Sequence, residues 1–333
     1  TSMGVEFRNE GVRSNVLGKP MKEPQDVPFE KEGQYLKSDN RSNISYFLEH
    51  NVLLRRFTLS VGVLANYNSA LNEGIHFYPG IDASYRIGDN FRLYGSWNRA
   101  LRMPTFTDLY YEGKTNKGNP DLKPEESEAF EVGLKYNTYF LRAHIAGFYR
   151  KGKNMIDWVK EKPEDIWESQ NLTKVDNLGF ETNLSLLPRE LGNERFFIRK
   201  IELGYAFIHQ DKDSEGYISN YALDYLKHKF TAQLSHSIWK GFSATWYVRW
   251  QDRAGSYTKY ENLKPAYEEP YAPYCLVDMK VNWEYQRLNL YAELNNLLNS
   301  TYYDLGNIPQ PGIWFKAGFR YSCLLYTSDA ADE

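Results

Sequence analysis

The chain has 333 residues, with 40 basic and 43 acidic side chains mixed along its length, and a net charge of −3. This mixture excludes a basic nucleic-acid-binding face, so nucleic acid is not expected as a partner. Aromatic residues make up 16% of the chain, yet the mean hydropathy is −0.63 and no apolar run approaches the ~18 residues of a membrane-spanning helix. A helical membrane protein is therefore excluded, which leaves a soluble tyrosine-rich β protein or a transmembrane β-barrel.

Alternation of apolar and polar residues is the dominant pattern along the chain. From Cys275 to Tyr285 the odd positions are apolar, whereas positions 278, 280, 282 and 284 are Asp, Lys, Asn and Glu. Such alternation is typical of strands with one apolar face, and no helical period competes with it. It predicts about fourteen strands, most of them with the ~9–11 residues that a tilted strand needs to cross a bilayer. The predicted strands are 1–10, 41–51, 54–67, 76–87, 91–101, 127–137, 139–151, 172–187, 196–210, 226–238, 241–252, 272–284, 287–297 and 312–322.

The connections between these strands alternate between short and long. The short ones lie near 52–53, 88–90, 138, 188–195, 239–240 and 285–286. The long ones, rich in Gly, Pro, Asn, Asp and Lys, are 11–40, 68–75, 102–126, 152–171, 211–225, 253–271 and 298–311. Periplasmic turns and longer external loops are typical of outer-membrane barrels. The sequence therefore predicts an all-β, antiparallel transmembrane β-barrel in the bacterial outer membrane, with lipid as a partner.

A distinctive motif follows the strand predicted at 91–101. It reads Ala-Leu-Arg-Met-Pro-Thr-Phe-Thr-Asp-Leu-Tyr-Tyr at 100–111 and Gly-Asn-Pro-Asp-Leu-Lys-Pro-Glu at 118–125. The two later prolines fix φ and push the residues before them toward extended geometry, which predicts a stiff connector with Glu125 free to accept hydrogen bonds. We expect a structural role for its motif residues Arg102, Pro104, Asn119, Pro120, Leu122, Pro124 and Glu125.

A second motif precedes the last predicted strand. It reads Asn-Leu-Leu-Asn-Ser-Thr-Tyr-Tyr at 296–303 and Ile-Pro-Gln-Pro-Gly at 308–312. The Pro-Gly pair suits a tight turn before the final strand. We expect a structural role here too, for Asn296, Leu297, Pro311 and Gly312.

Both motifs resemble those of the TonB-dependent outer-membrane receptors, a family of energised importers of iron chelates, cobalamin and glycans. The second departs in detail, with Leu298 where the family commonly has Phe and Ile313 where it has Arg. The resemblance implies a barrel of about twenty-two strands, of which residues 1–322 would supply the last fourteen. It also implies that the signal peptide and plug domain are absent, so that TonB would act through a missing amino-terminal region.

The end of the chain breaks the strand pattern. Alternation runs through Phe319 and Tyr321, but position 323 is Cys323 and the remaining residues resemble a translated sequencing-library adapter. We therefore expect 323–333 to be a non-native tail read through from an adapter. On that hypothesis Cys275 is the only native cysteine and the chain has no native disulfide.

Clustered aromatic residues in the predicted external loops are candidates for contact with a ligand. Rings with a polar handle supply stacking area and hydrogen bonds, which suits a chelate, a corrin or a sugar. The alternative is that they form the outer aromatic girdle of the barrel. The candidate ligand-binding residues are Arg102, Phe106, Tyr110, Tyr111, Tyr257, Tyr260, Tyr302 and Tyr303.

Catalytic and metal-binding patterns are not found in the sequence. The six histidines are scattered singly, and no phosphate loop, nucleophile elbow or paired-cysteine motif occurs. We expect neither an enzyme nor a cofactor. The prediction is a receptor that takes up a small-molecule or glycan ligand with energy from TonB, with a surface lipoprotein as a further candidate partner. A passive porin remains the alternative, and it would need an open polar lumen with charged rings.

Overall fold

A computed structural model describes residues 1–30, 32–71, 74–162, 164–192, 195–213, 216–219, 225–262 and 264–322. The chain divides into two compact units. The first unit comprises Thr1–Lys135, Ile145–Phe180 and Ile208–Tyr225, and the second comprises Tyr136–His144, Glu181–Phe207 and Leu226–Glu333. The predicted non-native tail, 323–333, lies outside the described residues, as does Cys323.

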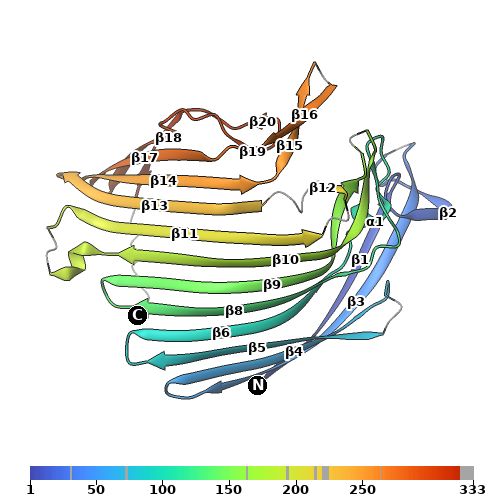
Figure 1. Cartoon of the computed structure of the whole chain (residues 1–333), viewed down its shortest axis with the longest axis horizontal. Coiled ribbons are helices and arrows are strands. Elements are labelled where there is room, and N and C mark those ends of the chain that lie inside the picture. The colour runs from blue at the N-terminus through green and yellow to red at the C-terminus, as the bar shows by residue number, and fades with distance from the viewer. Residues whose placement is uncertain are drawn as a thin grey trace, which may run out of the picture. The chain divides into compact units, whose positions relative to one another are not determined.

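Fourteen strands in the described part of the chain coincide with the predicted ones (Figure 1). They are β1 (Ser2–Ser14), β3 (Gln34–Leu53), β4 (Phe57–Asn68), β5 (Ile75–Ile87), β6 (Phe91–Arg102), β8 (Glu125–Asn137), β9 (Leu141–Lys160), β10 (Trp167–Leu186), β11 (Ile198–Asp213), β13 (Tyr225–Trp239), β14 (Phe242–Ala254), β17 (Tyr274–Tyr285), β18 (Leu288–Asn295) and β21 (Trp314–Tyr321). All the long ladders with a described register are antiparallel, which confirms the predicted fold class.

The long connections contain short elements of their own. They are β2 (Lys19–Asp26), α1 (Phe106–Tyr110), β7 (Asn116–Lys117), β12 (Ile218–Ser219), β15 (Ser256–Glu261), β16 (Lys264–Pro270), β19 (Tyr303–Leu305) and β20 (Ile308–Pro309). A short connection, predicted at 188–195, carries the 3₁₀ turn η1 (Pro188–Leu191). The loops are therefore more ordered than turn composition alone indicated.

Three predicted loops, 11–40, 152–171 and 253–271, are largely strand where they are described, so these predictions were wrong. Strand β3 begins at Gln34, and β9 and β10 have 20 residues each. Side-chain hydrogen bonds accompany the pairing beyond the apolar stretches: Asn9 Nδ2 donates to Ser42 Oγ at 3.0 Å, and Asn40 Nδ2 donates to Asn9 Oδ1 at 3.0 Å. The β3 extension carries mostly polar side chains, whereas the β9 extension carries apolar residues in adjacent pairs, Met155 with Ile156 and Trp158 with Val159, so apolar and polar residues do not alternate in either.

In the first unit, β1 pairs with β3, and β3, β4, β5 and β6 then pair in sequence order. This register places Ser45 opposite Asn66, and Leu64 opposite Tyr78. Side chains at alternate positions share a face. One face of β3–β5 therefore carries these residues together, and it forms the floor of the site described below.

In the second unit, β11 pairs with β13, while β14, β17, β18 and β21 pair in that order. The turn from β13 to β14 is made by Lys240 and Gly241, with φ values of 29° and 86°. Two-residue hairpins favour positive φ at both turn positions. A Cβ on Gly241 would lie 2.4 Å from the backbone oxygen of Glu284, so this position requires glycine.

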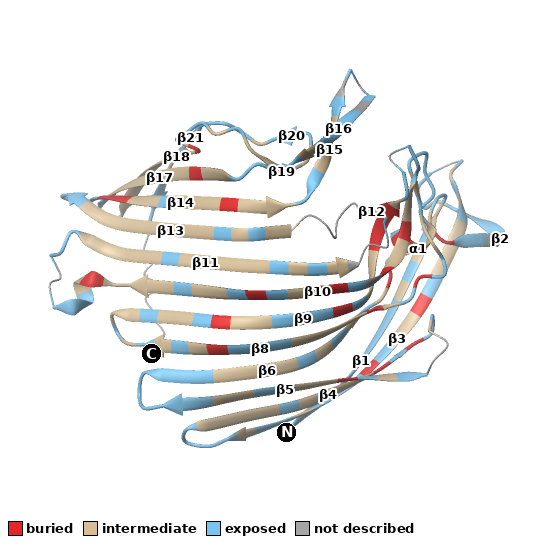
Figure 2. Cartoon of the chain, in the orientation of Figure 1, coloured by how far each residue is buried: buried red, intermediate tan, exposed pale blue. Residues whose placement is uncertain are grey.

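The polarity of the structure is inverted relative to a water-soluble protein. Asn68, Asp157 and Ser169 are almost fully buried, whereas Val132 and Phe319 are 59% and 74% exposed. In the first unit, buried residues gather near α1 and the adjoining strand ends (Figure 2). Soluble proteins bury their large apolar side chains, whereas barrels turn them toward lipid. No helix among the described residues is both long and apolar enough to span a bilayer.

Candidate functional site

Arg102 and Glu125, the two ends of the first motif, form an ion pair. Arg102 Nε donates to Glu125 Oε2 at 2.5 Å and Nη2 donates to Oε1 at 2.7 Å. Glu125 is 8% exposed, and its Oε1 also accepts from the backbone N–H of Ile156 at 2.8 Å. A bidentate pair fixes both side chains. The ion pair therefore holds the two ends of the motif together, and the bond from Ile156 links them to β9.

The segment between them begins with the short helix α1, which carries a capping box. Thr105 Oγ1 accepts from the backbone N–H of Asp108, while Asp108 Oδ2 accepts from the backbone N–H and hydroxyl of Thr105. The backbone oxygen of Asp108 accepts from Ser169 Oγ at 2.7 Å. The capping box satisfies N–H groups that would otherwise lack partners at the helix start. These contacts hold α1 against β10.

The predicted ligand contacts Phe106 and Tyr110 pack against β3. The Tyr110 hydroxyl donates to Asp39 Oδ2 at 2.5 Å, and burial, with this bond, raises the pKa of Tyr110. Arg41 lies 5.0 Å above the Phe106 ring and donates to the backbone oxygen of Pro104 at 2.6 Å. Tyr111 makes an edge contact with Trp158 at 6.5 Å between ring centroids. Phe106 and Tyr110 thus have partners within the first unit.

The proline-rich part of the motif lies along β10. Asn171 accepts from the backbone N–H of Lys123 at 2.8 Å and donates to its backbone oxygen at 2.9 Å. Leu122 is buried, and Asn119 Oδ1 accepts from the backbone N–H of Asp121. Pro120 and Pro124 bracket this contact. The connector is therefore held along its length rather than free in solvent.

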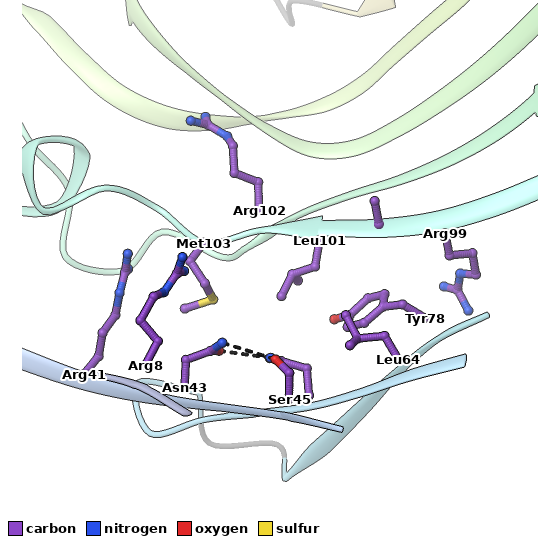
Figure 3. A pocket seen from close by; sticks show the side chains of 12 residues that line it. Arg8, Arg41, Asn43, Ser45, Leu64, Tyr78, Arg99, Leu101, Arg102 and Met103 are labelled. Atoms are coloured by element: carbon purple, nitrogen blue, oxygen red, sulfur yellow. Dashed lines mark hydrogen bonds between the residues drawn. The ribbon is translucent and has the colours of Figure 1, made fainter. Parts of the chain in front are cut away.

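A hollow of about 440 Å³ lies between the segment that follows Asn98 and the polar face of β3–β5. Figure 3 shows Arg99, Leu101 and Met103 directed toward β3–β5, and Arg102 directed the other way. Tyr78 also lines the hollow, and its hydroxyl oxygen is buried. The lining residues are Arg8, Arg41, Asn43, Ser45, Leu64, Asn66, Tyr78, Arg99, Ala100, Leu101, Arg102 and Met103.

Four arginines line this hollow, and their carboxylate partners do not. Arg8 and Arg41 both contact Glu10, at 2.9 Å and 2.6 Å. Arg99 contacts Glu126 at 3.7 Å and Glu128 at 3.3 Å, and Arg102 pairs with Glu125. Among the described lining residues there is no Asp or Glu. Each of the four lining arginines is therefore ion-paired with a glutamate that does not itself line the hollow.

Two buried polar atoms in this wall lack hydrogen-bond partners within the described part of the chain. They are Asn66 Oδ1 and the Tyr78 hydroxyl, in side chains that are 5% and 9% exposed. The neighbouring His76 Nε2 is unpartnered as well, and its strand register places it opposite Asn66. Buried polar groups are almost always hydrogen-bonded, so this hollow is the best candidate for a site in the first unit.

The second unit brings together another part of the predicted set. Tyr257 lies 5.8 Å from Tyr303 and 5.1 Å from Tyr271 between ring centroids, and Tyr302 lies 4.6 Å from Tyr274. These contacts join the β15–β16 hairpin to the loop that precedes β21. Tyr260, in contrast, is 55% exposed on the hairpin. The eight predicted ligand contacts therefore fall into two groups, four in each unit.

The second motif forms a compact turn. Asn296 is 4% exposed; its side chain donates to the backbone oxygens of Ser300 and Pro311 and accepts from the backbone N–H of Ser300. Leu297 N–H donates to Val277, and a Cβ on Gly312 would lie 2.6 Å from Asn299 Oδ1. Asn296 has a positive φ of 50°, which asparagine tolerates better than most residues. This turn fixes the direction in which the chain enters β21.

Metal-binding groups are not found among the described residues, where no three His, Cys, Asp or Glu side chains could hold an ion together. Sequence reasoning also missed most of the hollow. Asn43, Asn66 and Tyr78 lie on three different strands, and Arg8 and Arg41 on two. Their inward positions followed from alternation, but their grouping depends on strand register. Alternation alone does not determine that register.

The sequence is similar to those of known outer-membrane receptors and transporters. Residues 1–297 match the family model described as TonB dependent receptor-like, beta-barrel. The chain is 26% identical over 225 residues to the vitamin B12 transporter BtuB of Vibrio vulnificus, covering 51% of this chain and 36% of that protein. It is 22% identical over 312 residues to the ferrienterobactin receptor of Escherichia coli, covering 85% of this chain and 40% of that protein.

Solved structures show the same fold. The crystal structure of a mutant ferric enterobactin receptor, PfeA, from Pseudomonas aeruginosa superimposes with a TM-score of 0.71 at 19% identity, covering 96% of this chain and 50% of that one. The siderophore receptor PirA from Acinetobacter baumannii gives a TM-score of 0.69 at 16% identity, covering 96% and 51%. The chain thus spans about half or less of the length of these proteins.

Proposed function

Because this chain belongs to the TonB-dependent receptor-like β-barrel family, we propose that it is the barrel part of an outer-membrane receptor that takes up a scarce ligand with energy supplied through TonB. The family and its structural neighbours are receptors and transporters, and they lie in the outer membrane of Gram-negative bacteria. The relatives, a vitamin B12 transporter and a ferrienterobactin receptor, support cobalamin or an iron chelate as the ligand.

The observation that carries this proposal is the arrangement of the first motif. Residues 102–125 are fastened to β3, β9 and β10, and the residues before them roof a hollow with converging polar groups. Binding sites are recesses with a few convergent polar groups, whereas a passive channel needs an open polar lumen. A recess beside a segment that is hydrogen-bonded to three strands is more typical of a receptor's binding site than of the open channel of a porin.

The partners follow from the same proposal. Outer-membrane lipid would contact the exposed apolar face, which includes Phe7, Val132 and Phe319. TonB would act through an amino-terminal region that is not part of this chain. A surface lipoprotein is proposed only for the case of a glycan ligand, which the named relatives do not support.

Uptake by the complete receptor tests the proposal. The complete gene is expressed in a host that lacks its own siderophore and cobalamin receptors, with and without TonB. We expect saturable uptake of labelled ferric enterobactin or cyanocobalamin that disappears when TonB is deleted. Entry that rises linearly with external concentration and is unaffected by loss of TonB would instead identify a passive channel.

A further inference from the structure

We propose that Arg189, Arg199 and Ser237 form a binding site for a phosphate group, and that an anionic phospholipid is the molecule that carries it. The site lies in the second unit, where the short connection between β10 and β11 meets the end of β13. It is separate from the first motif and from the hollow, so it goes beyond the proposed function. Three observations support it: two cations share one neutral acceptor, this acceptor has a hydrogen left to donate, and exposed aromatic rings lie beside it.

Two arginines converge on one serine. Arg189 Nη2 donates to Ser237 Oγ at 2.7 Å, and Arg199 Nε donates to the same oxygen at 2.8 Å. Neither arginine is paired with a carboxylate within the described part of the chain, although Lys200, next to Arg199, pairs with Glu202 at 2.8 Å. Two positive charges held so close to each other repel. An anion bound between them would remove this repulsion.

The hydroxyl of Ser237 has a hydrogen to offer such an anion. A serine hydroxyl has two acceptor positions and one hydrogen to donate. The two arginines occupy both acceptor positions, and no bond among the described residues uses the hydrogen. Arg199 contributes only its Nε here, so both terminal nitrogens of its guanidinium lack a described partner. Guanidinium groups bind phosphate oxygens through two parallel hydrogen bonds, so Ser237 and Arg199 can donate to the same group.

The site is fixed in position and open to solvent. Arg189 Nε donates to the backbone oxygen of Phe196 at 2.8 Å, and the preceding residue, Pro188, is buried in the turn η1. The side chain of Arg189 is therefore held at both ends of its guanidinium. A group that is already fixed loses little freedom on binding. Arg189, Arg199 and Ser237 are each partly exposed, so a ligand can reach them.

Exposed aromatic rings beside the site favour a lipid as the source of the phosphate. The backbone N–H of Ser237 donates to the backbone oxygen of Phe197 at 2.7 Å. Phe197 is 57% exposed and Trp239 is 65% exposed, and Lys240 Nζ lies 5.0 Å from the centroid of the Trp239 ring. Aromatic rings beside cations are typical of the interface between a membrane and water. A free phosphate would leave these rings in water, whereas a phospholipid would cover them.

The charge of the short connections favours an anionic lipid. The connections 54–56, 88–90, 138–140, 187–197, 240–241 and 286–287 hold six basic and three acidic residues. The long connections predicted from the sequence hold 16 basic and 24 acidic residues. Short turns of outer-membrane barrels face the periplasm. Because basic segments are attracted to anionic membrane surfaces, the excess of positive charge would draw anionic lipid to the end where the site lies.

Hydrogen exchange of the peptide that contains Ser237 tests the site in the complete receptor. The receptor is placed in nanodiscs of phosphatidylcholine, alone or mixed with phosphatidylglycerol of the same chain length. We expect this peptide to exchange at least about fivefold more slowly with phosphatidylglycerol, because bound lipid stabilises the contact between Ser237 and Phe197. Equal protection by inorganic phosphate in phosphatidylcholine alone would retain the phosphate site and overturn the lipid as its source. Unchanged exchange with either addition would overturn the site.

Variants assign the protection to these side chains. The double variant Arg189→Gln, Arg199→Gln should lose it. The charge-matched double variant Arg55→Gln, Arg56→Gln, which removes two exposed arginines from the short connection between β3 and β4, should keep it. Equal loss in both would overturn the site in favour of a general attraction between a basic protein surface and anionic lipid.

A conservative variant separates geometry from charge. Arg199→Lys keeps the positive charge but has no planar fork of donors, so it should reduce the protection by phosphatidylglycerol. Full protection in Arg199→Lys would contradict the role given to the guanidinium. The heat-modifiable mobility of each variant on gels shows whether it has folded, so loss of protection is compared only among folded receptors.

The phosphate site and the transport function fail separately. TonB-dependent uptake by a receptor whose Ser237 peptide ignores phosphatidylglycerol and phosphate would overturn the site and retain the transport function. Unsaturable, TonB-independent entry through a receptor that shows the protection would overturn the transport function and retain the site.

Discussion

Glu125 is the residue at which the contacts of the first motif converge. It accepts from Arg102 twice and from the Ile156 N–H once, and it is buried while Arg102 remains half exposed. The sequence predicted Glu125 as a hydrogen-bond acceptor at the strand entry. It did not predict the donors, because they lie 23 and 31 residues away and only the folded register brings them together.

Replacement of Glu125 should loosen this junction. Glu125→Ala leaves the Ile156 N–H and the Arg102 guanidinium without their acceptor, at a cost of about 1–3 kcal/mol after allowance for the exposure of Arg102. Glu125→Gln keeps an acceptor for the N–H but loses the charge, so its cost should be smaller. Hydrogen exchange of the peptide that contains Ile156 measures both. Equal protection in wild type and Glu125→Ala would contradict the assignment.

At the level of elements, the strands were predicted where apolar and polar residues alternate, and their extensions were missed where this alternation fails. The alternating stretches of β4, β8 and β17 were all foreseen. The β15–β16 hairpin was not predicted, because apolar and polar residues do not alternate along its two strands. It is held instead by Tyr257, by Tyr303 and by a bond from Asn307 Nδ2 to the backbone oxygen of Thr258 at 2.7 Å.

This hairpin should respond to acid. Hydrogen bonds from Lys259 Nζ at 2.6 Å and then from Tyr257 lower the pKa of Glu269. A lowered pKa means that the contact is fully present above the ordinary Glu value of about 4.3 and is lost as the pH falls through the lower folded value. The same pair raises the pKa of Lys259, so the contact persists through neutral pH.

A nitroxide at position 260 reports this transition in the complete receptor with Cys275 and any other native cysteine replaced by serine. The label should be restrained at pH 7 and gain mobility as the pH falls below about 4. In the Glu269→Gln variant the label should be mobile at pH 7 as well as at low pH. A label that stays restrained at low pH would show that the aromatic contacts hold the hairpin without the ion pair.

At the level of the whole molecule, inverted polarity is the property that alternation predicted most directly. On β17, Val281 lies on the apolar face and pairs with Ala244 and Ala292, while Asn282 lines a polar hollow with Lys280 and Glu284. Faces could be predicted from the sequence because the period of two fixes them. The grouping of residues from separate strands could not.

Arginine substitutions on the two faces of β17 should have opposite outcomes. Val281→Arg places a charge toward the lipid near the middle of the strand and should destabilise the folded state by about 2–4 kcal/mol. Asn282→Arg, one residue away, should be tolerated. The fraction of complete receptor that folds into liposomes, read from its heat-modifiable mobility on gels, measures both. Equal yields from the two variants would contradict the assignment of lipid-facing and inward positions.

The length of β9 and β10 has a consequence for how antibodies bind this protein. Twenty strand residues extend about 65 Å, whereas crossing the hydrocarbon layer takes only ~9–11 residues. The residues beyond this length lie in water as paired strands, where side chains from neighbouring strands lie next to one another. Antibodies raised against the folded receptor should therefore recognise side chains contributed by several strands, and a serum raised against a single linear peptide from this region should bind the unfolded chain more strongly than the folded one.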